Sequence, residues 1–263
     1  MSVFFSLFFG FFLVAQAFES TALNADFLKA KATDFNAYQV FFELSAENNG
    51  LSAKELIEFV GPNAIKAFGD GFVDAIVHYL REPKAKEIEL GLPAVFSQKA
   101  SFSVSSVLPQ QLLSFFGKAK VAIQTMLVAK SMSLLLALVF LLVILIVASG
   151  VNSKMKWAGF SFALSGFLVL VFYLATPQIF FGFLQKTLSE NNLNALLPFA
   201  QSVVTGFFSL SALWGVSFLF FGIILFAISL FFSSQRKNQR ALEKKEIAEK
   251  RAEAEEREKL KRL

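Results

Sequence analysis

Three long stretches without an ionisable side chain constrain this chain more than any other feature. Residues 131–150 and 157–176 each give 20 such positions, and residues 206–232 give 27. A helix needs roughly 20 mostly apolar residues to cross the hydrocarbon core of a bilayer. Because 55% of the chain is hydrophobic and 35 of its residues are phenylalanine, the sequence predicts a mainly α-helical, integral membrane bundle rather than a soluble domain.

The first hydrophobic segment, residues 1–18, has two interpretations. Its apolar run from Val3 to Ala15 has the size of a signal-peptide core, and Ala15 and Ala17 form an A-x-A pattern that suits cleavage after Ala17. The lack of Lys or Arg before this core favours a retained signal anchor instead. The bundle therefore has three or four membrane helices, and in both cases residues from Glu19 onwards leave the cytoplasm.

Basic residues follow the predicted spans on one side. Lys and Arg resist translocation, so short loops that carry them stay in the cytoplasm. The candidate topology anchors lie in the connector 151–156 and at the start of the segment 233–263: Lys154, Lys156, Arg236, Lys237 and Arg240. We therefore expect a multi-pass plasma membrane protein with residues 19–130 outside and the C-terminus in the cytoplasm.

The net charge of +5 is concentrated on the same side. Residues 19–130 hold 11 basic and 12 acidic side chains, whereas residues 235–263 hold 11 basic and 7 acidic ones. No aromatic interleaving or groove-binding motif accompanies the basic residues. The excess therefore indicates orientation in the membrane, and we expect no nucleic-acid partner.

Residues 19–130 are predicted to form an extracytoplasmic, mostly helical domain. Gly61 and Pro62 predict the start of a helix with one buried face. Alternating residues in 86–107 predict a small β element, and a further helix is expected to run from Pro109 towards the second span. The apolar loop 177–205 is expected to form two helical pieces on which the domain could rest. The buried face of the Pro62 helix is expected to consist of Ile65, Phe68, Phe72, Ile76 and Leu80.

Few side chains in this domain suggest chemistry. The chain has no cysteine and one histidine, His78, so disulfides, thiolate catalysis and multi-histidine metal sites are excluded. Asp70, Asp74 and His78 share one helix face and could approach a cation, but a charged helix face often gives this spacing by chance. Gly69 and Gly71 indicate close helix packing, with no phosphate-loop spacing around them. We expect no catalytic residue, no cofactor and no metal site.

The three later spans contain serines and glycines and no charge. Charged residues at mid-bilayer are costly and are kept chiefly for ion or proton pathways, so ion-coupled transport and intramembrane proteolysis lack their required groups. The glycines at 159, 166, 215 and 222 favour tight helix packing, which in lipid depends on close approach. A small-solute permease that uses the Ser- and Gly-lined hairpin is a weaker alternative.

The end of the chain is predicted to be a charged cytoplasmic helix. Four Glu-to-Lys/Arg pairs at i, i+4 support a helix, whereas the apolar heptads of a coiled coil are missing. The pairs are Glu246 with Lys250, Glu253 with Arg257, Glu255 with Lys259, and Glu258 with Arg262. A solvated extension and a partner-binding helix are both open.

The order of segments resembles a group of uncharacterised archaeal and bacterial membrane proteins. A hydrophobic start is followed by TALNADFLKAKATDFNAYQVFFEL, a GPN break leading to VDAIVHYLREP, an alternating IELGL and three more spans. The resemblance implies a prokaryotic cell-envelope location and brings no catalytic motif. We expect a non-enzymatic envelope protein whose outer domain contacts another protein, the envelope or a second copy. The alternative is a signalling or assembly subunit that acts through the charged tail.

Overall fold

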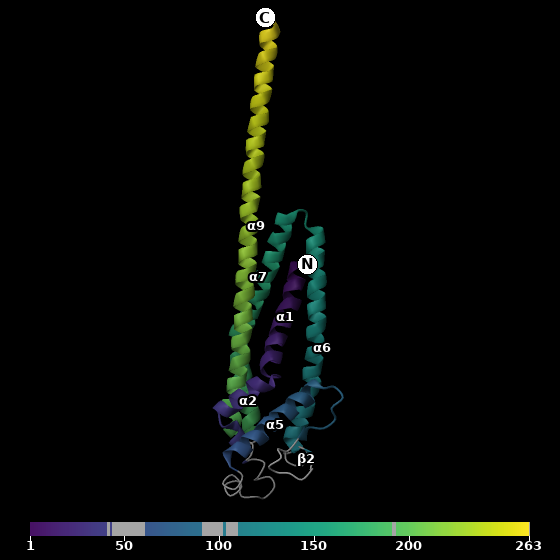
Figure 1. Ribbon diagram of the computed structural model, residues 1–263, viewed down its shortest axis with the longest axis vertical. Helices are drawn as coiled ribbons and strands as arrows, with labels where there is room; N and C mark the ends of the chain where they lie inside the picture. The colour runs from purple at the N-terminus through teal and green to yellow at the C-terminus, as the bar shows by residue number, and fades with distance from the viewer. Residues whose placement is uncertain (41–42, 44–60, 91–101, 104–109, 191–192, 263) are drawn as a thin grey trace.

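The computed structural model describes residues 1–40, 43, 61–90, 102–103, 110–190 and 193–262 (Figure 1). Within these residues four helices are long and apolar enough to cross a membrane, and they lie within Ser2–Thr21, Phe116–Val147, Val151–Ala175 and Asn194–Gln235. The prediction of a mainly helical, multi-pass membrane bundle is confirmed. The first hydrophobic segment is one of these four candidate spans.

Helix α1 (Ser2–Thr21) lies between α6 (Gln110–Val147) and α7 (Val151–Ala175), as Figure 1 shows. Phenylalanine rings hold it there: Phe9 meets Phe162 of α7 and Phe218 of α9 (Leu197–Arg262) edge to face, with ring centres 5.5 and 4.9 Å apart. Such pairs add about 0.5–1.5 kcal/mol to the burial of the rings. The predicted cleavage site lies inside this helix, where Ala15 and Ala17 are fully buried.

Helix α6 begins before its candidate span and continues through it without a break. It covers the expected helix after Pro109 and residues 131–147 of the predicted span at 131–150. The turn that follows occupies residues 148–150, where Gly150 has a φ of +81° that favours glycine. Helix α7 starts at Val151, so the predicted connector 151–156 is helical rather than a loop, because residues 148–150 already make the reversal.

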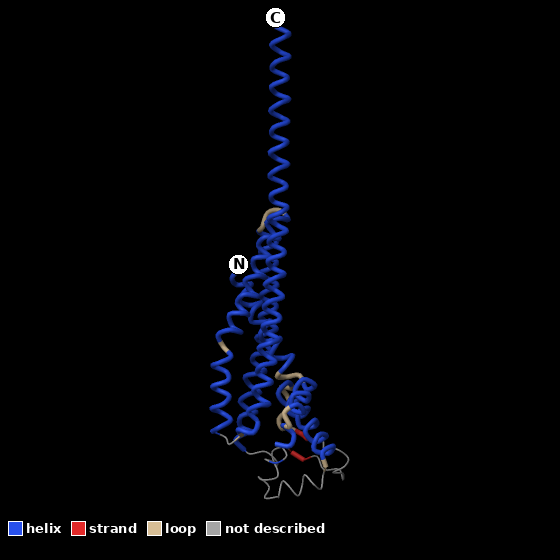
Figure 2. Tube along the Cα trace, turned by 90° about the vertical axis from the view of Figure 1, so that its left-hand side faces the viewer, coloured by secondary structure: helices blue, strands red, loops and turns tan. Residues whose placement is uncertain are grey.

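Helix α8 (Pro177–Glu190) and a short 3₁₀ helix (Asn194–Leu196) precede α9 (Leu197–Arg262). The two helical pieces predicted within 177–205 are therefore present. Helix α9 is 66 residues long and passes through the fourth span into the charged end of the chain. At 1.5 Å per residue, the part after Gln235 is about 40 Å long. Figures 1 and 2 show that it projects beyond the bundle.

Helices α7 and α9 are antiparallel and touch through glycine. A Cβ on Gly166 would stand 2.4 Å from the carbonyl oxygen of Gly215, and a Cβ on Gly222 would stand 2.2 Å from the backbone nitrogen of Ala163 and 2.5 Å from the carbonyl oxygen of Gly159. The two glycine pairs are seven residues apart on each helix, so both lie on one face. This confirms the predicted tight packing, and we call the contact the glycine seam.

The remaining elements gather at one end of the bundle, which we call the domain end. Helix α2 (Ala25–Asp34) and helix α5 (Pro62–Arg81) lie there beside α8 and the start of α9 (Figure 1). Strands β1 (Glu89–Leu90) and β2 (Phe102–Ser103) pair antiparallel within the predicted β segment, of which residues 91–101 and 104–107 lie outside the described part. The opposite, tail end carries the turn 148–150 and the extension of α9.

Helix α5 follows its sequence pattern. It begins at Pro62, as predicted, because proline suits the first helical turn. Ile65, Phe72 and Leu80 of the predicted stripe are buried, and Phe68 and Ile76 pack against buried residues around them. The buried face of α5 turns towards α2 and α6, which joins the domain-end elements to the bundle.

Candidate functional site

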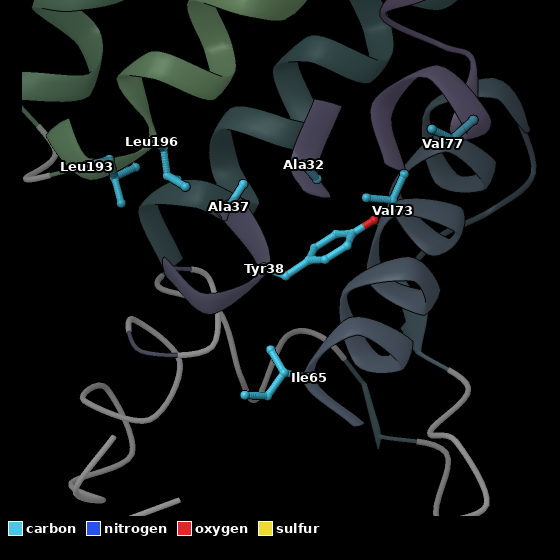
Figure 3. Packing of buried hydrophobic residues seen from close by; sticks show 8 residues of the cluster. All are labelled: Ala32, Ala37, Tyr38, Ile65, Val73, Val77, Leu193 and Leu196. Carbon is cyan, nitrogen blue, oxygen red and sulfur yellow. The ribbon is translucent and has the colours of Figure 1, made fainter. Parts of the chain in front are cut away.

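The hydrophobic core at the domain end is built from two separate parts of the chain. Helix α2, the segment after it and α5 supply six residues, and the connection between α8 and α9 supplies two leucines (Figure 3). The last two complete the cluster from the membrane hairpin, so the domain does rest on the loop, as the sequence suggested. We call this cluster the shared core: Ala32, Ala37, Tyr38, Ile65, Val73, Val77, Leu193 and Leu196.

Tyr38 is the polar member of the shared core. Its ring lies directly over Gly69 of α5, where a Cβ would stand 2.1 Å from Tyr38 Cδ1, so Gly69 packs as predicted. The Tyr38 hydroxyl donates a hydrogen bond of 2.5 Å to the carboxylate of Asp70. Burial raises the pKa of Tyr38 well above its ordinary value, and the hydrogen bond and negative charge of Asp70 raise it further. Tyr38 therefore acts here as a neutral donor that fixes α5 to the segment after α2.

A second contact seats α2 on α9. The ring of Phe27 covers Gly206, where a Cβ would stand 2.4 Å from the ring atom Cζ. Asn24 caps α2 by accepting a hydrogen bond of 3.2 Å from the backbone N–H of Phe27, which orders the first turn that carries the ring. The part of α9 at the domain end is thus covered by α2 and by the shared core.

An ionic contact joins α5 to two membrane helices where they reach the domain end. The Glu19 carboxylate at the end of α1 accepts from Lys130 of α6 and, at 3.3 Å, from Arg81 at the end of α5. The side chain of Lys130 is 16% exposed and that of Glu19 is 26% exposed. Ion pairs that are partly desolvated are screened less than exposed ones. We call Glu19, Arg81 and Lys130 the boundary cluster.

Lys120 makes a further link between α5 and α6. Its ammonium group donates to the carbonyl oxygen of Ala85 and lies 4.2 Å from the ring centre of Tyr79. The residue is 8% exposed. A buried ammonium is tolerated only with partners that accept or attract it, and here a carbonyl and an aromatic face serve that purpose.

The sequence had singled out Asp70, Asp74 and His78 as a weak cation candidate. In the structure the two carboxylates have different partners, since Asp70 accepts from Tyr38 and Asp74 pairs with Lys29 at 2.7 Å. His78 is exposed on α5. No group of three His, Asp or Glu side chains in the described part of the chain is placed to hold a metal ion. The two aspartates therefore join α5 to α2 and to the segment after it.

The predicted topology anchors fall into two groups at the tail end. Lys154 and Lys156 lie in the first two turns of α7, and the Lys156 ammonium is 5.9 Å from the ring centre of Phe226 on α9. Arg236, Lys237 and Arg240 follow directly after the fourth candidate span, which ends at Gln235. Both groups lie at the same end of the bundle (Figure 1), as an out-and-back hairpin requires.

The serines of the hairpin are engaged rather than free. Ser161, Ser165 and Ser211 are buried, and each hydroxyl donates to the carbonyl four residues earlier in its own helix. Ser229 instead donates across to the carbonyl of Asn152 at 2.7 Å. These hydrogen bonds occupy the hydroxyl groups of four of the serines that the permease hypothesis would use.

Sequence reasoning did not find the boundary cluster or the contact between Phe27 and Gly206. Two signals were present. Glu19 is the first charge after an uncharged segment and Lys130 is the last charge before a span, so both had to lie at the same membrane boundary.

In comparisons with known protein families, curated proteins and solved structures, none matches the chain. What its geometry offers is a mechanical connection between the domain end and α9.

Proposed function

We propose that this protein is a non-enzymatic subunit of the prokaryotic cell envelope that binds a protein partner outside the membrane and conveys that binding to its cytoplasmic tail. The observation that carries the proposal is the shared core, in which Leu193 and Leu196 of the membrane hairpin complete the core of the domain-end elements. A domain built in this way cannot shift without moving the start of α9.

The orientation in this proposal rests on the basic residues. Lys154 and Lys156 lie at the same end of the bundle as Arg236, Lys237 and Arg240 (Figure 1), and Lys and Arg near span ends favour the cytoplasm. The domain end is then extracytoplasmic. Helix α9 leads from that end to Arg262 as one helix, so it is the element able to carry a displacement across the membrane.

The partner surface that we propose lies where α2 meets α9. A pocket of 520 Å³ opens between them, lined by Lys31 and Phe35 of α2 and its end, and by Gln201, Ser202 and Thr205 of α9. Phe35 is 43% exposed beside it. Exposed aromatic residues next to a pocket are typical of the anchors of protein interfaces. A partner that occupies this pocket would touch both the domain and α9.

Two spin labels test the mechanical connection between the domain end and α9. Because the chain has no cysteine, no other site would be labelled. Val151 and Gln239, both exposed at the tail end, are replaced by cysteine and labelled in the full chain in nanodiscs, and the distance distribution between the labels is measured. We expect Phe27→Ala to shift or broaden this distribution, because it removes the seat of α2 on α9. The control is Phe183→Ala on α8, where the ring is 65% exposed. Identical distributions in all three proteins would refute the connection.

A passive envelope-binding role, in which the tail only anchors the chain, is the second candidate, favoured by the lack of apolar heptads in the tail. Truncation after Gln235 separates the two roles. If the shortened protein inserts normally and fully complements a strain that lacks the gene, the tail has no signalling role. Loss of complementation with normal insertion supports the first proposal. Solute flux into liposomes that contain the protein, absent from empty ones, would be needed to retain the permease alternative.

A further inference from the structure

A groove of 640 Å³ lies at the tail end of the bundle, beside the turn 148–150 that joins α6 to α7. The last turns of α6 and the first turns of α7 form its walls, and the first residues of α1 form its floor. Figure 1 shows that α1 lies between α6 and α7 but starts short of the turn. The groove is the space left between the start of α1 and the turn, and its volume is in the range of ligand sites, about 300–1,000 Å³.

Trp157 gives the depth of the groove in the membrane. It is the first residue of the charge-free stretch 157–176 and is 48% exposed, as expected of a tryptophan at the headgroup level. Phe160 lines the groove about one turn deeper along α7, and Ile144 lines the facing wall. The groove therefore runs from the headgroups into the hydrocarbon. Because its inner walls are apolar, a hydrocarbon chain of the surrounding leaflet fills it at a lower free energy than water does.

Two serines mark the outer mouth of the groove. Ser149 belongs to the turn, and Ser153 lies in the first turn of α7. Ser149 is exposed and Ser153 is half-buried, so both hydroxyls can donate to a ligand. Hydroxyls at the mouth and apolar walls inside follow the order of a phospholipid, in which the phosphate lies outside the acyl chains.

The charge beside the groove is positive. Lys154 and Lys156 follow Ser153 within the first two turns of α7. Helices α1, α6 and α7 carry one acidic residue between them, Glu19, and it lies at the domain end. The helices that form the groove therefore offer the two lysines no carboxylate at this end. Lysines at the membrane surface attract anionic lipid headgroups.

We propose that this groove binds one anionic phospholipid of the leaflet at the tail end. The hydroxyls of Ser149 and Ser153 donate to its phosphate. The two lysines beside them favour a negative headgroup, and one acyl chain lies between the walls of α6 and α7. The lipid would hold α6 and α7 apart next to the turn, as α1 does along the rest of the bundle. This site is separate from the partner surface at the domain end and does not depend on the proposed function.

The first experiment fills the groove. The full chain in detergent is titrated with phosphatidylglycerol, and bound lipid is counted by native mass spectrometry. Ser153→Phe places a ring in the groove, whereas Ser217→Phe makes the same change at an exposed position of α9 outside it. We expect Ser153→Phe to weaken phosphatidylglycerol binding about tenfold, the effect of excluding about two methylene groups, and Ser217→Phe to leave it unchanged. If Ser153→Phe does not fold, Ala148→Phe fills the same groove from the other wall.

The second experiment tests the charge. Phosphatidylcholine and inorganic phosphate are titrated in the same way. The wild type should bind phosphatidylglycerol more tightly than phosphatidylcholine, on the order of tenfold, and the double variant Lys154→Gln/Lys156→Gln should lose this preference. Arg236→Gln/Lys237→Gln removes the same charge at the same end from α9, which does not line the groove, and should keep the preference.

Thermal unfolding provides a readout that does not depend on mass spectrometry. Phosphatidylglycerol should raise the melting temperature of the wild type more than that of Ser153→Phe. Equal phosphatidylglycerol binding by these two proteins would overturn the proposal. So would equal affinity for phosphatidylcholine and phosphatidylglycerol, an equal loss of preference in the α9 control, or stabilisation by inorganic phosphate as large as that by the lipid.

Discussion

Gly69 of α5 lies beneath the ring of Tyr38 so closely that a Cβ at position 69 would stand 2.1 Å from Tyr38 Cδ1 and 2.4 Å from Tyr38 Cγ. The ring is held on its other edge by the hydrogen bond of 2.5 Å from its hydroxyl to Asp70. The glycine and the tyrosine therefore determine each other: the ring fits because position 69 has no side chain, and the hydroxyl reaches Asp70 because the ring lies so close to α5.

The first prediction follows from this contact. Gly69→Ala should lower the free energy of unfolding by about 1–3 kcal/mol, the usual cost of overpacking, despite the higher helix propensity of alanine. Thermal unfolding in one detergent, followed by circular dichroism, measures the change. Gly117→Ala on α6 is the control, because nothing lies within 4 Å of a Cβ there, and its stability should stay equal or rise. Equal effects of the two substitutions would show that the Tyr38 contact is not tight.

The glycine seam gives a graded series. A Cβ would stand 2.2 Å from backbone at Gly222, 2.4 Å at Gly166 and 2.7 Å at Gly159, whereas the first contact at Gly215 is a Leu170 side-chain atom at 3.1 Å. Backbone atoms cannot move aside as a side chain can. Alanine at position 222 or 166 should therefore lower the free energy of unfolding most, by about 1–3 kcal/mol, and alanine at position 215 should lower it least. Thermal midpoints in one detergent would give the order. Gly182→Ala, with open space around it, should cost nothing.

The pH dependence of the domain should depend on Tyr38. Burial, together with Asp70, raises the pKa of Tyr38 in the folded state, while the unfolded chain releases the tyrosine proton at about pH 10. Below pH 10 both states are protonated and the stabilisation is complete. Above pH 10 the unfolded state gains by losing its proton and the folded state does not, so stability falls as the pH rises.

Thermal unfolding between neutral and strongly alkaline pH tests this sign. The melting temperature of the wild type should fall more steeply above about pH 10 than that of Tyr38→Phe, which lacks the titrating group. At neutral pH the variant should itself be less stable by about 1.5–3 kcal/mol, the usual contribution of a hydrogen bond to a charged group. Parallel alkaline slopes in the two proteins would show that Tyr38 titrates normally.

The sequence predicted most of the helices because their causes are local. The charge-free lengths of three spans and Pro62 at the start of α5 are features of single helices, and Gly166 and Gly222 mark a helix face that has no side chain. The sequence could not assign the first 18 residues, because the hydrophobic core of a signal peptide and a short membrane span look alike in sequence. They differ mainly in the helices that pack around them. Here Phe9 meets Phe162 and Phe218, and these rings are more than 150 residues away along the chain.

The candidate site was harder to predict because each of its contacts joins distant residues. Phe27 covers Gly206, and Leu193 and Leu196 join a core with Tyr38. No periodicity along the chain records such pairs. The boundary cluster is the exception, since the membrane restricts charges at span ends to two planes. Glu19 and Lys130 could therefore have been paired from the sequence, as the nearest charges to two spans on the same side.

The boundary cluster gives the last prediction. Glu19→Gln leaves the two cations Arg81 and Lys130 without their carboxylate, and Lys130 is only 16% exposed. Leaving a buried charge unpaired costs several kcal/mol, but exposure of the partners reduces this, so we expect a loss of about 1–2 kcal/mol. Lys130→Met alone should lower the free energy of unfolding by less than Glu19→Gln does, because methionine can occupy the apolar space that the methylene groups of Lys130 fill. The double variant should lose less than the two single changes together, since a second removal breaks a contact already absent. Strictly additive losses of thermal stability would show that Glu19 and Lys130 do not stabilise each other.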